Sequence, residues 1–208
     1  MDNPSLQTIP AIHYEQTGAV WQLSEHFLLT IPFNSPLLFC CIGTDRSTGD
    51  ALGPLIGSQL QGDFAFPFPI IGTLEKPLHA LNLQETVEGI HQQIEQPFII
   101  AIDACLGEER AIGQILLQHG PLYPGRAVKK KLPPIGDLSI KGIVNVGGYM
   151  ETTVLQNTRL HVTTSIADKI ARGLLLAWQR HLLKGKYNRH NHSNNQNTWQ
   201  QIRYADFR

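Results

Sequence analysis

Two aspartates follow apolar runs of the kind that form buried strands. The run 37–42 is continuously apolar, and Asp50 lies in the glycine-rich segment 43–53 that comes after it. Asp103 comes directly after a second apolar run, 98–102. Such runs are typical of strands that a parallel sheet buries on both faces, and the crevice of an open α/β sheet lies beyond the carboxyl ends of its strands. If the two strands are neighbours, Asp50 and Asp103 face the same crevice.

Two carboxyl groups in one crevice have the chemistry that hydrolysis needs. Like charges a few ångströms apart resist double ionisation, so one carboxyl keeps its proton while the other is ionised. The ionised group takes a proton from water, and the protonated group donates to a leaving group or polarises a carbonyl. Asp50 opens the helix expected over 50–61, whose dipole favours the anion by ~0.3–1 kcal/mol. Asp103 is therefore the better candidate for the raised pKa.

The same residues also have structural interpretations. Asp50 could be the N-cap of the helix, and Asp103 could hydrogen-bond a loop. The glycine-rich loop, with Arg46 as its basic residue, could cradle a phosphate. Its spacing, however, fits neither G-x-G-x-x-G nor G-x-x-x-x-G-K-[ST], and Asp50 would repel an anion at the helix start. The residues alone do not decide between these interpretations and a catalytic pair.

Cysteine and metal chemistry are weaker candidates. Cys105 could act as a nucleophile beside His119 or His161, but no spacing fixes such a contact, and an inert, partly buried thiol is the plainer interpretation. Asp50, Asp103 and a histidine could bind a divalent ion. No two histidines have the H-E-x-x-H spacing of a zinc protease.

The elements that would position these residues alternate along the chain. Apolar runs predict strands and helical spacing predicts helices, which favours a three-layer α/β/α sandwich with a mostly parallel central sheet. The expected strands are 37–42, 68–73, 98–102, 113–118 and 140–146, and the expected helices are 50–61, 82–94, 149–157 and 160–184. The Pro- and Gly-rich segment 120–137 is a long loop, which we expect to act as a lid.

We expect three parts: an N-terminal arm at 1–30, a single α/β domain at 31–184, and a polar, disordered C-terminal tail at 185–208. The 208 residues carry 17 Lys+Arg and 17 Asp+Glu, and 42% are apolar. This composition excludes an acidic disordered chain, a basic nucleic-acid coat and a coiled-coil rod.

Cysteine usage and the N-terminal segment indicate a cytoplasmic protein. There are three cysteines, of which Cys40 and Cys41 are adjacent, and this pattern fits a reducing compartment. The N-terminus has no basic start followed by an apolar run, so no signal peptide is expected. The longest apolar run is far shorter than the ~20 residues that cross a bilayer. We therefore expect no membrane and no nucleic-acid partner.

The segment Ile42-Gly43-Thr44-Asp45-Arg46-Ser47-Thr48-Gly49-Asp50-Ala51-Leu52-Gly53-Pro54 closely resembles the YyaC family of sporulation proteins from spore-forming Firmicutes, a similarity that covers about residues 37–183. That family is similar to the germination protease of small acid-soluble spore proteins, and more distantly to the hydrogenase maturation proteases. In the germination protease, an Asp in T-P-D-A-L-G-P and an Asp in I-D-A are the proposed catalytic pair of an atypical aspartic peptidase. The matching residues here are Asp50 and Asp103.

The resemblance implies a phosphorylase/hydrolase-like fold and a site without metal or other cofactor. The maturation proteases bind metal through two acids and a later His, and Lys141 stands where we expect that His. Gly49 replaces the Pro that precedes the first Asp of the germination protease. The chain is also shorter than the germination protease, so we do not carry over that enzyme's propeptide control.

We therefore expect a sporulation-associated peptidase in the sporulating cell or forespore, acting on a protein or peptide such as a spore protein. The alternatives are a non-enzymatic sporulation factor that binds a protein partner and a metal-dependent maturation-type protease. A homo-oligomer is compatible with the peptidase and with both alternatives. Besides the catalytic pair, the expected substrate-binding residues are Thr44, Asp45, Arg46, Thr48 and Cys105.

Overall fold

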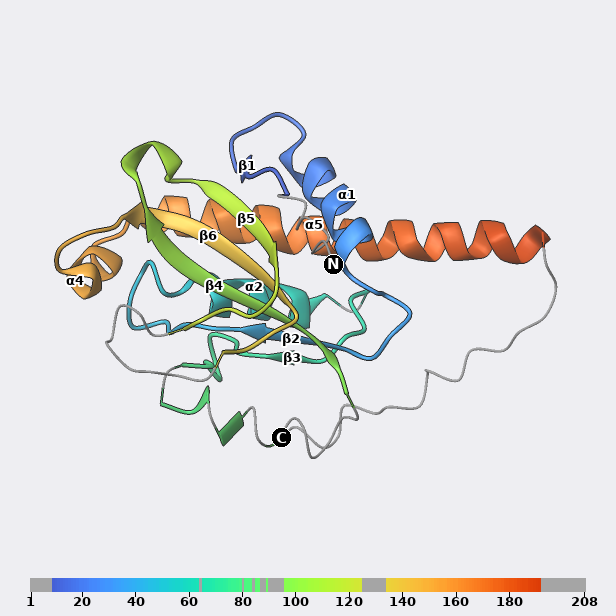
Figure 1. Ribbon diagram of the computed structural model, residues 1–208, viewed down its shortest axis with the longest axis horizontal. Helices are drawn as coiled ribbons and strands as arrows, with labels where there is room; N and C mark the ends of the chain where they lie inside the picture. Colours follow the sequence, from blue (N-terminus) through green and yellow to red (C-terminus); the bar gives the residue numbers. More distant parts are fainter. Residues whose placement is uncertain are drawn as a thin grey trace, which may run out of the picture.

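The computed structural model describes residues 9–63, 65–79, 81–83, 85–86, 89, 96–124 and 134–191. In this part of the chain a six-stranded sheet has the order β1-β5-β6-β4-β2-β3 (Figure 1). The strands are β1 (Ile12–His13), β2 (Leu37–Cys41), β3 (Ile70–Ile71), β4 (Phe98–Gly107), β5 (Gln114–His119) and β6 (Leu138–Val146). The helices are α1 (Ala19–Thr30), α2 (Leu52–Gly62), α4 (Glu151–Gln156) and α5 (Leu160–Asn191), with a 3₁₀ turn, η1 (Glu109–Ala111).

The sheet is mixed, with parallel pairing at its centre. β3, β2, β4 and β6 pair in parallel, while β5 and β1 pair antiparallel at the other side. β5, the strand expected over 113–118, is antiparallel because only the short connection 108–113 separates it from β4, whereas a parallel strand needs a crossover of a dozen or more residues. The predicted α/β sandwich with a mostly parallel sheet is confirmed.

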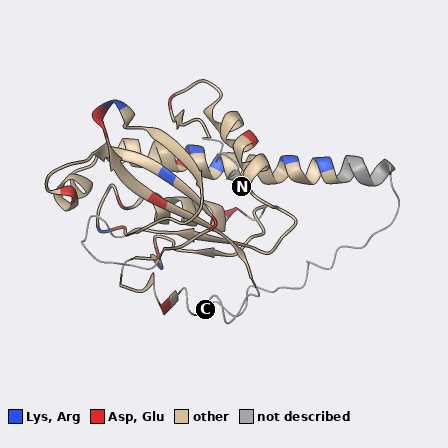
Figure 2. Ribbon diagram, viewed as in Figure 1, with Lys and Arg blue, Asp and Glu red and all other residues tan. Residues whose placement is uncertain are grey.

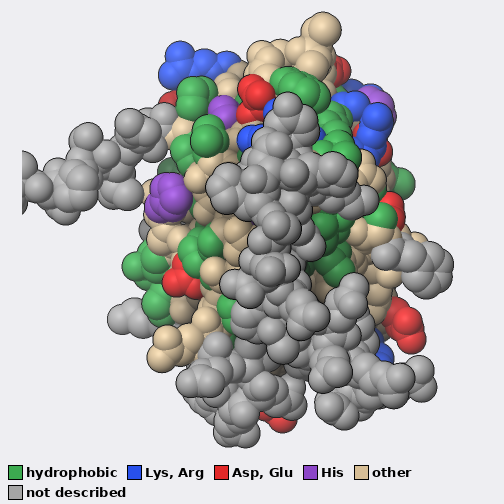
Figure 3. All heavy atoms as spheres, turned by 90° about the vertical axis from the view of Figure 1, so that its right-hand side faces the viewer, with side chains coloured by type: hydrophobic (Ala, Val, Ile, Leu, Met, Phe, Trp, Pro, Cys, Tyr) green, Lys and Arg blue, Asp and Glu red, His purple; other side chains and the backbone are tan. Residues whose placement is uncertain are grey.

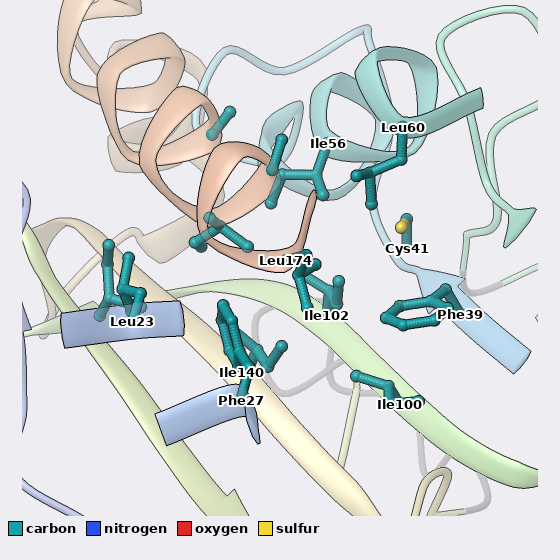
Figure 4. Packing of buried hydrophobic residues seen from close by; sticks show 14 of the residues in the cluster. Leu23, Phe27, Phe39, Cys41, Ile56, Leu60, Ile100, Ile102, Ile140 and Leu174 are labelled. Carbon is teal, nitrogen blue, oxygen red and sulfur yellow. The ribbon is translucent and has the colours of Figure 1, made fainter. Parts of the chain in front are cut away.

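Helices α1, α2 and α5 cover one face of the sheet. Figure 4 shows Phe27 from α1, Ile56 from α2 and Leu174 from α5 packed against strand residues such as Ile102 and Ile140. Each side chain of this kind that is fully buried contributes roughly 1.5–3 kcal/mol. A second, smaller cluster lies on the other face and consists of Leu38, Cys40, Ile42, Leu78, Leu83, Ile99, Ala101, Leu122 and Ile135. The sheet is therefore enclosed from both sides at β2 and β4.

The segment that we expected to be an N-terminal arm contributes to this core. Leu23 and Phe27 are fully buried, and α1 packs along α5. Arg180 of α5 donates a hydrogen bond to Ser24 Oγ at 2.6 Å, and its guanidinium lies 3.9 Å from the centroid of the Trp21 ring. The core of the domain therefore begins well before residue 31.

Some expectations fall on residues that the structure does not describe. α5 extends past the expected end at 184 to Asn191, and the rest of the expected tail, 192–208, lies outside the described residues. The same holds for much of the helix expected over 82–94 and for 125–133 of the expected lid. None of the helices in the described part of the chain combines the length and the apolar character that a membrane span requires.

Candidate functional site

A pocket of about 790 Å³ opens beyond the carboxyl end of β2, beside the C-terminal half of β4. The two strands are parallel neighbours in which Cys41 lies opposite Ile102, the last residue of β4 that pairs with β2. β4 continues to Gly107 by pairing with β6, so Asp103 lies within the strand, whereas the sequence analysis expected the strand to end at 102. Asp50 and Asp103 both line the pocket. The remaining lining comes from residues 42–46, 104–106 and 122–124, and from Leu74, Glu75, Pro77, His79, Leu81, Lys141, Glu151 and Leu155. The prediction that the two strands are neighbours is confirmed, and the two aspartates meet at one pocket.

The loop after β2 folds back so that Asp50 reaches the end of its own strand. Gly43 has φ +143, and a Cβ on it would lie 1.9 Å from the carbonyl oxygen of Asp50. The Thr44 amide donates to that same oxygen at 3.2 Å. Helix α2 then begins at Leu52 with Ala51 as its N-cap and no side-chain cap. Asp50 is thus not the N-cap, and the structural interpretation of this residue is wrong.

Helix α4 holds the loop from the other side. The Gly49 amide donates to the Leu155 carbonyl oxygen at 2.9 Å, and a Cβ on Gly49 would lie 2.8 Å from Leu155 Cδ2. Proline has no amide proton to donate. A proline at position 49 could not make this bond, so the Gly49 amide ties the Asp50 loop to α4.

Burial controls the protonation of both aspartates. Burial, followed by the charge of Asp50, holds the pKa of Asp103 well above its usual value, against smaller lowering effects of the Ala104 amide and Lys141. The Ala104 amide donates to Asp103 Oδ1 at 2.8 Å. Burial also raises the pKa of Asp50. The direction of the Asp103 shift agrees with the raised pKa that the sequence analysis expected. At Asp50 the helix dipole was expected to lower the pKa, but burial raises it.

Lys141, which the sequence analysis noted only as standing where a metal-binding His was expected, is a pocket residue beside Asp103. It lies directly opposite Asp103 in the β4–β6 pair, and Figure 2 shows the basic position of β6 next to the acidic position of β4. Its Nζ donates to Gln118 Oε1 at 3.5 Å. The available signal was a lysine between Ile140 and Gly142 in a mostly apolar strand, a place where a charge is seldom found without a partner or a function.

His79 is a second pocket residue that the sequence analysis missed. Its ring lines the pocket, and its Nδ1 is buried without a hydrogen-bond partner in the described structure. The parallel bridge between Ile42 and Leu78 brings it to the end of β2. Because this bridge joins residues distant in sequence and lies outside the regular strands, no local pattern marks His79.

The expected substrate-binding residues divide into two groups. Thr44, Asp45, Arg46 and Cys105 line the pocket, and Thr48 is not part of its lining. Burial, followed by the charge of Asp103, raises the pKa of the Cys105 thiol to about 11. Because the thiolate is the reactive form, this environment disfavours Cys105 as a nucleophile.

Neither His119 nor His161, the two histidines considered as partners of Cys105, lines the pocket. His161 lines a separate depression next to Tyr14 and Asp168, and His119 is exposed on β5. Within the ranges that the structure describes, no three His, Cys, Asp or Glu side chains are grouped so that they could hold a metal ion.

Comparison with known proteins identifies relatives of this chain. It is similar to the [NiFe] hydrogenase maturation protease HycI from Thermococcus kodakarensis KOD1, with a TM-score of 0.46 and 16% identity over 70% of this chain and 93% of that one. It is 50% identical to the protein YyaC of Bacillus subtilis (strain 168) over 141 residues, 68% of this chain and 69% of YyaC. The resemblance to the germination protease stays a prediction. Residues 11–173 match the family described as "Protein of unknown function (DUF1256)", and the chain therefore belongs to this family of YyaC-like proteins.

Proposed function

We propose that this protein is a peptidase that hydrolyses peptide bonds of a protein substrate, with Asp50 and Asp103 as its acid–base pair. The observation that carries the proposal is that Asp50, from the loop after β2, and Asp103, from the neighbouring parallel strand β4, line one pocket, where the charge of Asp50 raises the pKa of Asp103. The resemblance of segment 42–54 to sporulation proteins extends the proposal to a spore protein as substrate.

The environment assigns a different role to each carboxyl group. Asp103 keeps its proton because it is the more deeply buried group and faces the negative charge of Asp50. Asp50, whose pKa is raised by burial alone, loses its proton first. Because Asp103 Oδ1 accepts the Ala104 amide, the acidic proton of Asp103 is held on Oδ2. One carboxylate and one carboxylic acid are then present together, as acid–base hydrolysis requires.

The proposed reaction needs only proton transfers to and from these two carboxyl groups, and it regenerates both of them. Asp50 takes a proton from water as the water oxygen attacks the scissile carbonyl carbon, and Asp103 donates its proton to the carbonyl oxygen. The tetrahedral diol collapses when Asp50 gives its proton to the leaving nitrogen and Asp103 takes one from a diol hydroxyl. The C–N bond breaks, a carboxylic acid and an amine leave, and both aspartates return to their starting states.

Detection of new protein N-termini tests this proposal. Soluble extract from sporulating cells of a Bacillus subtilis strain lacking YyaC is incubated with the wild-type protein, Asp50→Asn or Asp103→Asn, and new N-termini are labelled and identified by mass spectrometry. Asp168→Asn on α5, which ion-pairs with Arg172 at 3.3 Å, is the matched control. Circular dichroism verifies that every variant is folded.

We expect the wild-type protein and the Asp168→Asn control to produce the same set of new N-termini. Loss of a positioned acid or base costs about 10²–10⁴-fold in rate, so both active-site variants should produce essentially none. The proposal is overturned if the wild-type protein produces no new N-termini, or if either active-site variant produces the wild-type set.

A further inference from the structure

Large apolar side chains that are exposed to solvent gather around the pocket. Leu74, Leu81 and Tyr123 line it and are 40%, 78% and 60% exposed. Tyr149 and Met150 are 96% and 74% exposed and directly precede Glu151, which also lines the pocket. We call these five residues the apolar rim. Three separate segments of the chain contribute to it, so the rim is a feature of the folded surface.

The apolar rim differs from the other exposed apolar residues of the described chain. Single exposed apolar side chains are normal on a protein surface, whereas a group of them next to a concave site marks a binding surface. Trp21 on α1 is partly covered by the guanidinium of Arg180. Figure 3 shows the molecule from the right-hand side of Figure 1. On the coloured part of this face, hydrophobic side chains are scattered among polar and charged ones.

The backbone takes an unusual conformation at Met150, one of the rim residues. Met150 has φ 56 and ψ 43, the left-handed region that L-residues other than glycine rarely occupy, and Gly148 has φ +140. A strained residue of this kind persists only where the surrounding structure holds it, and such residues concentrate at ligand sites. Helix α4 begins at Glu151 directly after Met150, and through Leu155 it is tied to Gly49 in the Asp50 loop.

We infer that the apolar rim binds the substrate, and that the substrate class is an extended peptide segment with large apolar side chains next to the scissile bond. The inference rests on the proposed function, since it takes the pocket of Asp50 and Asp103 as the place of cleavage. A volume of about 790 Å³ accommodates several residues of a peptide rather than one side chain. An extended chain presents its side chains alternately to either side, so apolar ones reach the rim while the backbone meets the carboxyl groups.

Binding of defined peptides tests the inference without requiring cleavage. The Asp50→Asn protein, which should not consume peptides, is titrated against two fluorescent decapeptide pools of equal net charge. One pool has Leu, Phe or Met at the central positions, and the other has Ser or Asn there. Fluorescence polarisation gives the Kd of each pool. We expect the apolar pool to bind at least tenfold more tightly than the polar pool.

Two double variants, each in the Asp50→Asn background, locate the binding surface. Leu81→Ser with Met150→Ser removes two rim side chains, and Leu29→Ser with Leu183→Ser removes two side chains of similar exposure, 83% and 64%, from α1 and α5. The rim variant should lose the tenfold preference, and the control variant should keep it. Circular dichroism shows that each variant is folded. Equal binding of the two pools, or an equal loss in both variants, overturns the inference.

The outcome separates this inference from the proposed function. If the apolar pool binds through the rim but no new N-termini form in extract, the peptidase proposal fails and the rim remains a peptide-binding surface. If the wild-type protein cleaves but the two pools bind equally, only the inference about the substrate class fails.

Discussion

Replacing Asp103 with Asn tests whether its carboxyl group is protonated in the folded protein. Burial and the charge of Asp50 hold the pKa of Asp103 well above its usual value, whereas the unfolded chain releases this proton near pH ~3.9. Between these two pKa values the folded state binds one proton more than the unfolded state. The free energy of unfolding contributed by this group therefore falls as the pH rises, by about 1.4 kcal/mol per pH unit.

Asparagine carries no ionisable proton, so the variant lacks this contribution. Relative to the wild-type protein, Asp103→Asn should become more stable by about 1.4 kcal/mol for each pH unit between ~4 and the folded-state pKa of Asp103. Across two pH units inside this window, the difference amounts to about 2.8 kcal/mol. The difference in the free energy of unfolding between Asp103→Asn and the wild-type protein should therefore shift in favour of the variant as the pH rises through this window.

Urea unfolding at pH 5, 6 and 7, followed by tryptophan fluorescence, measures this difference. Trp178 reports on unfolding because its ring packs against Phe68 and Phe33, with centroid distances of 4.9 and 5.9 Å. Asp168→Asn is again the control, because Asp168 is partly exposed, and its profile should run parallel to that of the wild-type protein. If the wild-type and Asp103→Asn stabilities change with pH at the same slope, Asp103 is ionised in the folded protein and the assignment of the acid is refuted.

Three further predictions follow from the loop and the pocket. Gly49→Pro removes the hydrogen bond to the Leu155 carbonyl and should lower the free energy of unfolding in urea by about 1–3 kcal/mol; unchanged stability would show that α4 does not hold the loop. Gly43→Ala places a Cβ against the Asp50 carbonyl oxygen and should sharply reduce the yield of folded protein, and wild-type yield and urea stability would argue against the described loop. Because the pKa of Cys105 is raised to about 11, iodoacetamide should modify it at pH 7.5 about 100-fold more slowly than an ordinary exposed thiol, as followed by peptide mass spectrometry; equal rates would mean that the thiol is accessible and ionisable.

The strands that carry the site could be predicted from the sequence because burial on both faces leaves a continuous apolar run. The runs 37–42 and 98–102 are found as β2 and β4, but β4 continues to Gly107, so Asp103 lies within the strand and not after it. The direction of β5 was harder to predict, because an apolar run does not indicate whether the strand is parallel or antiparallel to its neighbour. Only the shortness of the connection before it reveals the direction.

The contacts that complete the site join segments that are distant in the sequence. Lys141 lies beside Asp103 because β6 pairs with β4, and His79 reaches the pocket through its neighbour Leu78, which bridges to Ile42. Thr48 was expected in the pocket because it precedes Asp50 closely in sequence, but the reversal of the loop takes it out of the lining. The apolar rim could not be found from residue types, since exposure alone distinguishes its members from core residues.

A titration of the two aspartates by carbon NMR tests the central claim most directly. In protein labelled with ¹³C at the aspartate carboxyl carbons, Asp50→Asn and Asp103→Asn spectra assign the two signals. We expect Asp103 to titrate well above the ~3.9 of an exposed aspartate, and its pKa to fall when Asp50 becomes Asn, because the negative charge that raises it is gone. Titration of both carboxyls near ~3.9, or an Asp103 pKa that does not respond to Asp50→Asn, would contradict the shared-pocket account.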